Sequence, residues 1–240
     1  MASTENQLDT NDNGSSNVNN LPPLPPAYLR ALHLIDEAHR QDPNLVDGPA
    51  GPGTLPYEAH YAQQMTRWLG ERSPRASPAL QLACRAQHFR RWELPRSSFP
   101  MTRPGYLTWR SKQKSQAASQ VASLLSSPPP ASSSHAKAAA VEEEEAETIP
   151  QPDIDRIAAL IRKENLAADP EAQALEDVAC LVFLDGQLDA FERRDDVGED
   201  KMVAILRKTW AKMGAEGRAI ALRMDLSDRA RTLVGKALEG

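Results

Sequence analysis

The sequence predicts an all-α protein with a single helical domain. Apolar residues recur every three or four positions in several segments, whereas the period-2 alternation of strands appears nowhere at convincing length. Two segments of biased composition leave roughly one domain's worth of foldable chain among the 240 residues. We therefore expect a disordered tail at residues 1–24 and one helical domain at residues 25–240, interrupted by a low-complexity acidic insertion at residues 126–149.

The N-terminal tail is rich in Asn, Ser, Thr and Asp, so it cannot bury enough apolar surface to offset the entropy of ordering it. A Pro-rich run at residues 21–26 is stiff and extended, and it leads into a first helix over about residues 27–40. We expect His33 and His39 to be solvated or to lie at the rim of that helix.

Local signals mark where the later helices start. In Ser77-Pro78 a capping serine precedes a proline in the first helical turn. In Thr102-Arg103-Pro104 a capping threonine precedes an arginine and a proline in the first turn. The most apolar segment, residues 174–191, is apolar on most sides and should lie at the centre of the fold. The expected helices cover about residues 27–40, 57–71, 77–94, 102–125, 152–163, 174–191, 200–212 and 227–238.

The net charge of -5 comes from the two biased segments. The tail carries -3 and the insertion carries -4, so the rest of the chain is near +2. A nearly neutral domain with one basic region favours a local anion site over a broad nucleic-acid surface. The acidic insertion itself is typical of a solvated spacer or of a partner-binding segment.

The cysteines and the apolar segments of the sequence bear on the cellular compartment and on membrane association. Cys84 and Cys180 each lie in an apolar helical pattern and form neither a disulfide framework nor a C-x-x-C pair. The first residues of the sequence do not show a positively charged start followed by an apolar run, and no apolar stretch approaches the about 20 residues needed to span a bilayer. We therefore expect a cytoplasmic protein.

The most informative stretch runs from Arg85 to Lys114. It holds eight Arg and Lys side chains against one acidic residue, Glu93, together with five of the chain's twelve aromatic residues. Arginine side chains that are not interspersed with acidic residues repel one another, so they need an external anion or an acidic partner. Arg103 also stands at an expected helix N-terminus, where backbone N–H groups attract anions. The expected ligand-binding residues are Arg90, Arg91, Trp92, Arg96, Arg103 and Tyr106.

Three acidic or imidazole side chains stand on expected helix faces that point inward. His88 and Asp177 could ligate a metal, pair with each other or with an arginine in a structural set, or lie near solvent. Glu58, early in its helix, could be a third ligand or a general base, or an acid favoured there by the helix dipole.

Several stretches resemble the domain of unknown function 4202 family. The run Ala86-Gln87-His88-Phe89-Arg90-Arg91-Trp92-Glu93 is the most specific of them, and the resemblance covers about residue 28 to the C-terminus apart from the insertion. Some fungal members carry the label glutamyl-tRNA synthetase, but the sequence has neither the signatures nor the alternating strands of that enzyme. The other stretches are Tyr61-Ala62, Pro95-Arg96, Tyr106-Leu107, Trp109-Arg110, residues 175–184 and residues 206–210.

The chain also resembles the HD-type metal phosphohydrolases, which are all-helical enzymes. That resemblance implies an HD-like arrangement in which Glu58, His88 and Asp177 are the catalytic and metal-binding residues, with a divalent metal as cofactor. The chain departs from the pattern because Glu58 replaces the first His and Phe89 replaces the Asp expected after His88. A member that binds a phosphorylated ligand without hydrolysing it is therefore an alternative.

We predict a function from these observations. The expected activity is binding, with metal-assisted hydrolysis as a further step, of a phosphorylated small molecule or nucleotide. The alternative is a non-catalytic interaction module that uses the basic stretch on an acidic protein partner. Neither a membrane nor double-stranded nucleic acid is an expected partner.

Overall fold

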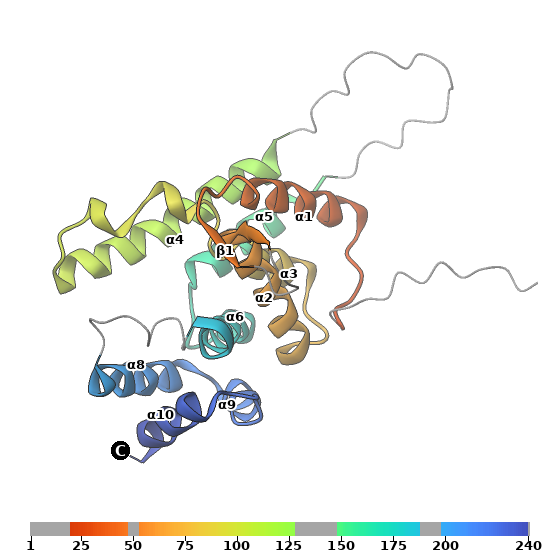
Figure 1. Cartoon of the computed structure of the whole chain (residues 1–240). Coiled ribbons are helices and arrows are strands. Elements are labelled where there is room, and N and C mark those ends of the chain that lie inside the picture. The colour runs from red at the N-terminus through yellow and green to blue at the C-terminus, as the bar shows by residue number, and fades with distance from the viewer. Residues whose placement is uncertain (1–19, 48–52, 128–147, 188–197, 240) are drawn as a thin grey trace, which may run out of the picture.

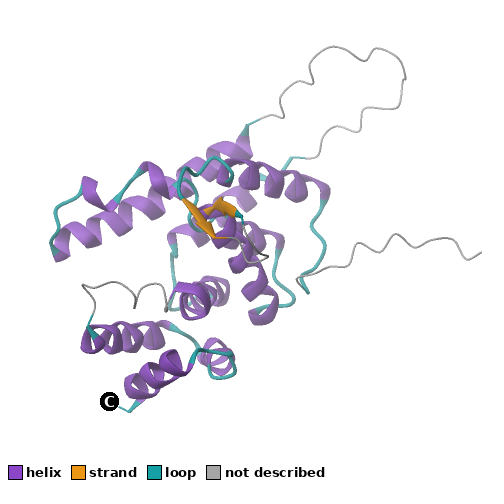
Figure 2. Ribbon diagram, viewed as in Figure 1, coloured by secondary structure: helices purple, strands orange, loops and turns teal. Residues whose placement is uncertain are grey.

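The computed structural model describes residues 20–47, 53–127, 148–187 and 198–239. These ranges are built of helices and one small two-stranded sheet, so the all-α prediction is confirmed (Figures 1 and 2). In chain order the α-helices are α1 (Pro26–His39), α2 (Tyr57–Arg72), α3 (Pro78–Arg85), α4 (Arg103–Ser126), α5 (Gln151–Arg162), α6 (Pro170–Val182), α8 (Glu199–Lys212), α9 (Ala215–Ala221) and α10 (Asp228–Leu238).

Four helices begin at a polar side chain that caps the first turn. Ser77, Thr102 and Ser227 each accept a hydrogen bond from the backbone N–H three residues later. Asp169 accepts from two backbone N–H groups at the start of α6. Such caps stabilise a helix by about 1 kcal/mol each. Those at Ser77, Thr102 and Ser227 explain why these three expected helix starts agree with the structure, whereas α6 begins at Pro170, four residues before its expected start near residue 174.

The core forms where α2 and α6 pack at the centre of the molecule. Helix α3 packs against α2 and α5, and α4 lies along α5. Leu69, Leu82, Ile157 and Leu181 are fully buried there, each stabilising the fold by about 1.5–3 kcal/mol relative to an exposed side chain. Helices α8 and α10 pack on each other and meet the rest through α6 and α9 (Figure 1).

The helix expected over residues 77–94 is too long, because α3 ends at Arg85. Arg90 then adopts a left-handed backbone (φ 48°, ψ 40°), followed by the 3-10 turns η1 (Arg91–Glu93) and η2 (Arg96–Ser98). The cause lies outside the segment. The buried carboxylate of Glu58 accepts the backbone N–H groups of Arg90 and Arg91 at 2.9 and 2.5 Å, which draws them out of a helical pattern.

Helix α6 confirms the central helix, but its end differs from the expected one. After Val182 the chain continues as a π-helical turn, η3 (Phe183–Gln187). The expected helix ran to residue 191, and residues 188–191 lie outside the described ranges.

A short antiparallel hairpin precedes α2 and was not expected. Strands β1 (Leu45–Asp47) and β2 (Thr54–Pro56) pair with Leu45 opposite Pro56. Three residues are too few for a period-2 pattern, so the sequence could not show them. The hairpin leads directly into α2, which carries Glu58.

The ends of the two biased segments pack more closely than expected. Leu21, which we assigned to the tail, is buried in the core, and so is Ile149 at the end of the expected insertion. The predicted disorder of residues 1–19 and the low-complexity residues 128–147 lie outside the described ranges. In the part of the chain that the structure describes, no helix combines the length and the apolarity that a membrane span requires.

Candidate functional site

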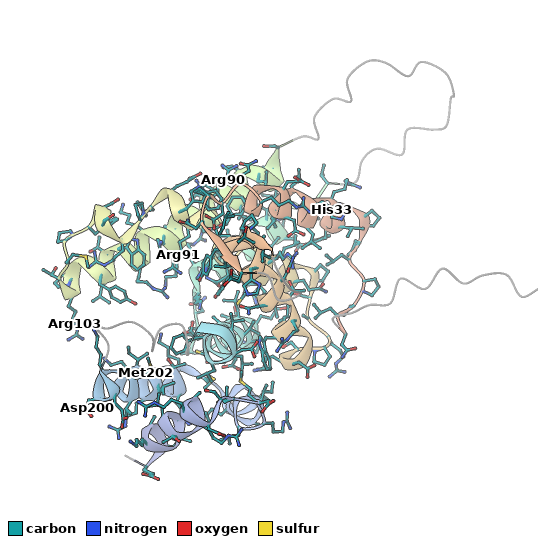
Figure 3. The ribbon with its side chains drawn as sticks, viewed as in Figure 1. His33, Arg90, Arg91, Arg103, Asp200 and Met202 are labelled. Atoms are coloured by element: carbon teal, nitrogen blue, oxygen red, sulfur yellow. The ribbon has the colours of Figure 1, made fainter. Side chains whose placement is uncertain are left out.

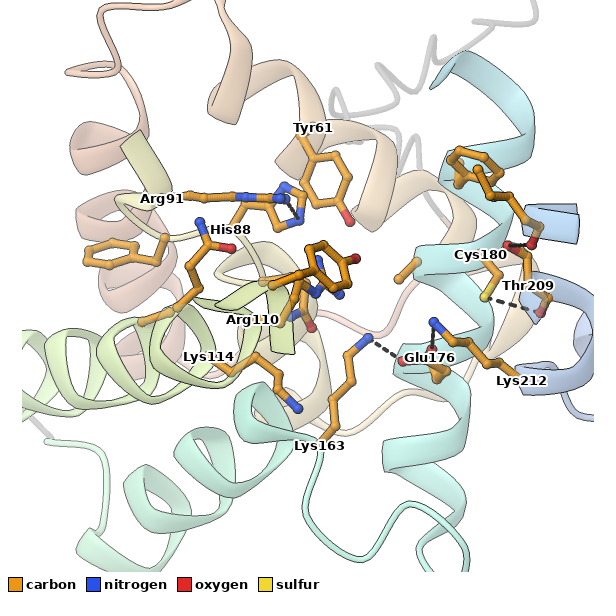
Figure 4. A pocket seen from close by; sticks show the side chains of 18 residues that line it. Tyr61, His88, Arg91, Arg110, Lys114, Lys163, Glu176, Cys180, Thr209 and Lys212 are labelled. Atoms are coloured by element: carbon orange, nitrogen blue, oxygen red, sulfur yellow. Dashed lines mark hydrogen bonds and ion pairs between the residues drawn. The ribbon is translucent and has the colours of Figure 1, made fainter. Parts of the chain in front are cut away.

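A pocket of about 390 Å³ lies among α4, α6, α8 and the turn that follows α3 (Figure 4). This volume is within the range of small-molecule sites in proteins. Among the described residues, five cationic side chains line the pocket and Glu176 is the single carboxylate in the lining. The lining therefore carries an excess of four positive charges when His88 is neutral. The five cations are Arg91, Arg110, Lys114, Lys163 and Lys212.

His88 and Arg91 lie together on one wall (Figure 4). A guanidinium only donates, so Nη1 of Arg91 donates to Nε2 of His88 at 2.8 Å, which places the imidazole hydrogen on Nδ1. The imidazole stacks on the ring of Tyr61 at 3.7 Å. Burial, reinforced by the charge of Arg91, holds the pKa of His88 well below 6.5, so the ring is neutral at physiological pH.

Two buried polar atoms in this wall have no hydrogen-bond partner among the described residues. They are Nδ1 of His88 and Oε1 of Gln87, and both side chains line the pocket. A buried donor or acceptor without a partner costs about 1–3 kcal/mol. These two atoms are therefore a hydrogen-bond donor and an acceptor that a bound molecule could satisfy.

The guanidinium of Arg91 also lies over Trp109, 5.1 Å from the ring centre. Trp109 is fixed in turn by donating its indole N–H to the carbonyl of Leu94 at 2.9 Å. Burial, and then the neighbouring charge of Arg110, lower the pKa of Arg91. The indole and the imidazole thus hold a cation in the wall without supplying a negative charge.

Helix α4 contributes Arg110 and Lys114, which are one helical turn apart. Neither has an ion-pair or hydrogen-bond partner in the described part of the chain. Partial burial, and then the charges of Lys163 and Arg110, lower the pKa of Lys114. Like charges at this spacing repel each other across one helix face.

On the opposite wall, Glu176 of α6 lies between two lysines (Figure 4). Lys163 donates to its Oε2 and Nζ of Lys212 lies 3.6 Å from its Oε1. Burial alone would raise the pKa of Glu176, but Lys163 and Lys212 outweigh it and the pKa is lowered. Lys163 ends α5 in a left-handed conformation (φ 59°), an uncommon backbone for a residue with a side chain.

Cys180 also lines the pocket. Burial raises the pKa of its thiol to about 12, and its Sγ is directed at the carbonyl of Thr209 at 3.8 Å. Because the thiolate is the nucleophilic form, Cys180 is an unreactive thiol near neutral pH.

Glu58 does not line the pocket but shapes its wall. It is 1 % exposed, and besides the two backbone N–H groups it contacts Nδ1 of His39 at 3.2 Å. Nε2 of His39 in turn donates to the carbonyl of Arg85 at 2.9 Å, so our expectation of a solvated or rim position for His39 was wrong. Burial raises the pKa of Glu58, with the bond to His39 acting against it. Together Glu58 and His39 fix the turn that carries His88 and Arg91.

Asp177 is wholly buried and faces away from the pocket. Its Oδ2 accepts from Nε of Arg72 at 2.7 Å, and its Oδ1 accepts from the side chain of Gln173 at 2.8 Å and from the backbone of Gly214 at 2.7 Å. A side chain at Gly217 would place its Cβ 2.6 Å from Cγ of Asp177. This cluster joins α2, α6 and α9.

The three residues predicted to hold a metal are therefore not brought together. A divalent metal needs several carboxylate, thiolate or imidazole donors around one point. The oxygens of Glu58 and Asp177 already accept hydrogen bonds in two separate clusters. In the part of the chain that is described, no group of three or more His, Cys, Asp or Glu residues could hold a metal ion. The donor set does not fit a metal, and the metal role stays a prediction without support from this arrangement.

Of the six expected ligand-binding residues, Arg91 and Tyr106 line the pocket. Arg96 donates to the carbonyls of Phe99 and Pro100 at 2.9 and 2.8 Å, outside the pocket. Figure 3 shows Arg103 at the outer end of α4, far from Arg91.

The remaining two expected residues lie outside the lining as well. Arg90 places its guanidinium over the ring of Phe89, 5.4 Å from the centre, and Trp92 belongs to the turn η1.

The pocket also contains residues that the sequence did not single out. Lys114 is the last residue of the basic stretch, but it was not among the expected ligand-binding residues. Lys163 and Lys212 each lie near the end of a helix, where isolated lysines are common. Glu176 carried the same signal as Asp177, a charged residue inside the most apolar helix. The structure places Glu176, and not Asp177, in the lining of the pocket.

A comparison with models of protein families matches residues 29–234 to a family described as Domain of unknown function (DUF4202). The match spans nearly all of the helical domain and confirms the resemblance seen in the sequence. No curated protein and no solved structure matches the chain.

Proposed function

We propose that this chain, which belongs to the DUF4202 family of domains of unknown function, binds a phosphorylated small molecule or nucleotide in the pocket. One observation carries the proposal. In the described part of the chain, five cationic side chains face a single carboxylate inside a pocket of about 390 Å³.

The charge excess favours an anion for a physical reason. Two like charges 4 Å apart repel by about 4 kcal/mol at the effective dielectric constant of a protein surface, so clustering cations without partners costs stability. Among the described residues, the side chains of Arg110 and Lys114 have no partner, and the guanidinium of Arg91 donates only to a neutral imidazole. A phosphate would remove the repulsion and accept the charged hydrogen bonds that arginine and lysine provide.

The geometry supports binding better than metal-assisted hydrolysis. Among the described residues, the imidazole, carboxylate and thiol of the lining are engaged or unreactive: Nε2 of His88 accepts from Arg91, Glu176 is paired with two lysines, and Cys180 is a protonated thiol. The proposed function is therefore recognition of the phosphorylated molecule.

The experiment is a thermal-shift and calorimetric titration at constant ionic strength. Inorganic phosphate, a hexose monophosphate and nucleotides are added to the wild type, to Arg110→Met and to Arg103→Met, an exposed arginine of the same helix. At one hundred times Kd, binding should add about 2.7 kcal/mol of stability, which raises Tm by about 5–10 °C.

Arg110→Met should lose most of this increase, and Arg103→Met should keep it. A Tm that none of these compounds raises contradicts the proposal. An equal loss in both variants would place the anion on the exposed arginines, as the interaction-module alternative requires.

A further inference from the structure

The five cations of the pocket form two groups. The side chains of Arg91, Arg110 and Lys114 have no acidic partner in the described part of the chain. Lys163 and Lys212 reach Glu176 from two sides, whereas Arg91 lies beside His88 in another part of the pocket (Figure 4). The positive charge is therefore spread along the pocket.

The total charge exceeds what one phosphate neutralises. A phosphate monoester carries about -1.5 to -2 at pH 7. The lining residues that the structure describes include five cations and one carboxylate, an excess of four positive charges. One phosphate would leave about half of the excess, whereas two phosphates would nearly balance it.

The second group has room to take part in binding. The side chain of Lys212 is 55 % exposed, and its Nζ lies 3.6 Å from Glu176, so the lysine can turn toward another anion. Glu176 would keep its bond to Lys163. In this arrangement Glu176 is an internal counter-ion that holds the lysines in place until a phosphate shares them.

The aromatic rings of the first wall are already covered. His88 stacks on Tyr61 at 3.7 Å, and the guanidinium groups of Arg91 and Arg96 lie 5.1 and 5.9 Å from the ring centre of Trp109. A nucleobase gains affinity mainly by stacking on such rings. These two rings support the cations and are not open to a base. Tyr106 and Phe183 also line the pocket, so charge is the main source of affinity and a nucleotide probe tests whether a base adds to it.

On the basis of the proposed function, we infer that the ligand is a compact molecule with at least two phosphate groups and that its recognition does not require a nucleobase. Arg91 and Arg110 hold one phosphate, and Lys163 and Lys212 hold the other. Lys114, which is close enough to feel the charges of both Lys163 and Arg110, lies between these two pairs of residues. Inorganic pyrophosphate and a bisphosphorylated sugar are the simplest members of this class.

The test compares affinities within one calorimetric series at constant ionic strength. The probes are inorganic phosphate, pyrophosphate, glucose 6-phosphate, fructose 1,6-bisphosphate and ADP. We expect pyrophosphate and fructose 1,6-bisphosphate to bind at least about tenfold more tightly than the monophosphates, and ADP to bind no more tightly than pyrophosphate.

A matched pair of variants on α8 locates the second phosphate. Lys212→Met should weaken binding of the two bisphosphorylated probes about tenfold and leave the monophosphates within about twofold, because it removes one charged contact from one group only. Lys208→Met, one turn earlier on the same helix and exposed, should change neither.

The outcomes separate the two proposals. Monophosphates that bind as tightly as bisphosphates would overturn the two-phosphate inference and leave the proposed function standing. ADP that binds far more tightly than pyrophosphate would show that a base is read, which also overturns the inference. If no probe binds, the proposed function itself fails.

Discussion

Asp177 and Glu176 are neighbours on α6, yet the charge around them is arranged in opposite ways. Asp177 faces a closed cluster in which Arg72, Gln173 and the backbone of Gly214 satisfy its two oxygens. Glu176 faces a pocket in which it is outnumbered five to one by cations. The first cluster holds helices together, and the second has charge left over for a ligand.

This comparison shows what distinguishes a structural polar residue from a functional one. Both carboxylates are buried in the same apolar helix, so burial and residue type do not separate them. The balance of charge and hydrogen bonds around each carboxylate is what separates them. A balanced cluster should respond to mutation with lost stability, and an unbalanced one should respond with lost binding.

The largest effect is expected from Asp177→Ala. The substitution leaves the guanidinium of Arg72, which is 13 % exposed, without its buried partner and with only the exposed Glu216 at 3.5 Å. Removing one member of a buried ion pair costs about 3–5 kcal/mol. Urea denaturation gives the free energy of unfolding, with Lys212→Met in the pocket as the control. A loss below about 1 kcal/mol would show that the cluster is not what joins α2, α6 and α9.

Gly217→Ala tests the same cluster from its other side. A Cβ at this position would lie 2.6 Å from Cγ and 2.9 Å from Cβ of Asp177, so the helices must separate. Overpacking of this kind costs about 1–3 kcal/mol. Gly235→Ala is the matched control, because nothing lies within 4 Å of a Cβ there and α10 should gain up to about 1 kcal/mol. If both substitutions change the free energy of unfolding equally, Gly217 does not approach Asp177 closely.

The pocket wall should make stability depend on pH through His88. The unfolded chain takes up a proton at this residue near pH 6.5, whereas the folded chain does so only well below it. Below pH 6.5 the unfolded state thus binds more protons, and the free energy of unfolding falls by up to about 1.4 kcal/mol per pH unit as pH decreases.

His88→Phe keeps a ring against Tyr61 but removes the titrating group, so this part of the pH dependence should disappear. The free energy of unfolding is measured from pH 7.5 to pH 5 for the variant and the wild type. The same substitution at His33, which lies exposed on α1 (Figure 3), is the control. Parallel curves for wild type and His88→Phe would contradict a buried neutral imidazole.

The smallest effect is expected from Lys114→Met. Removing one of two like charges a turn apart should leave stability unchanged or raise it by about 0.2–0.5 kcal/mol. The exposed Lys112→Met on the same helix serves as the reference. A loss of more than about 1 kcal/mol would mean that Lys114 stabilises the fold and that its charge in the pocket is not unpaired.

Most of the fold could be predicted from the sequence because its determinants are local. The caps at Ser77 and Thr102 and the apolar faces of the helices lie within one or two turns of the structure they specify. The turn after Arg85 was missed because its cause, the carboxylate of Glu58, lies about thirty residues earlier in the chain. A local pattern cannot show such a long-range hydrogen bond.

The candidate site could be predicted only in part. Arg91 and Tyr106 belong to a dense basic and aromatic stretch that is visible in the sequence. Lys163 and Lys212 arrive from the ends of α5 and α8, and nothing in their neighbouring residues distinguishes them from ordinary surface lysines. Which of two adjacent acids faces the pocket depends on the rotation of α6, which packing sets.

Lysine acetylation in the presence of inorganic pyrophosphate tests the central claim most directly. Rates of modification are measured by mass spectrometry for each lysine, with and without saturating pyrophosphate at constant ionic strength. If the unbalanced pocket is the anion site, Lys114 and Lys212 become protected while the exposed Lys112 and Lys208 keep their rates. Unchanged rates at Lys114 and Lys212, or equal protection of all four lysines, would contradict the account.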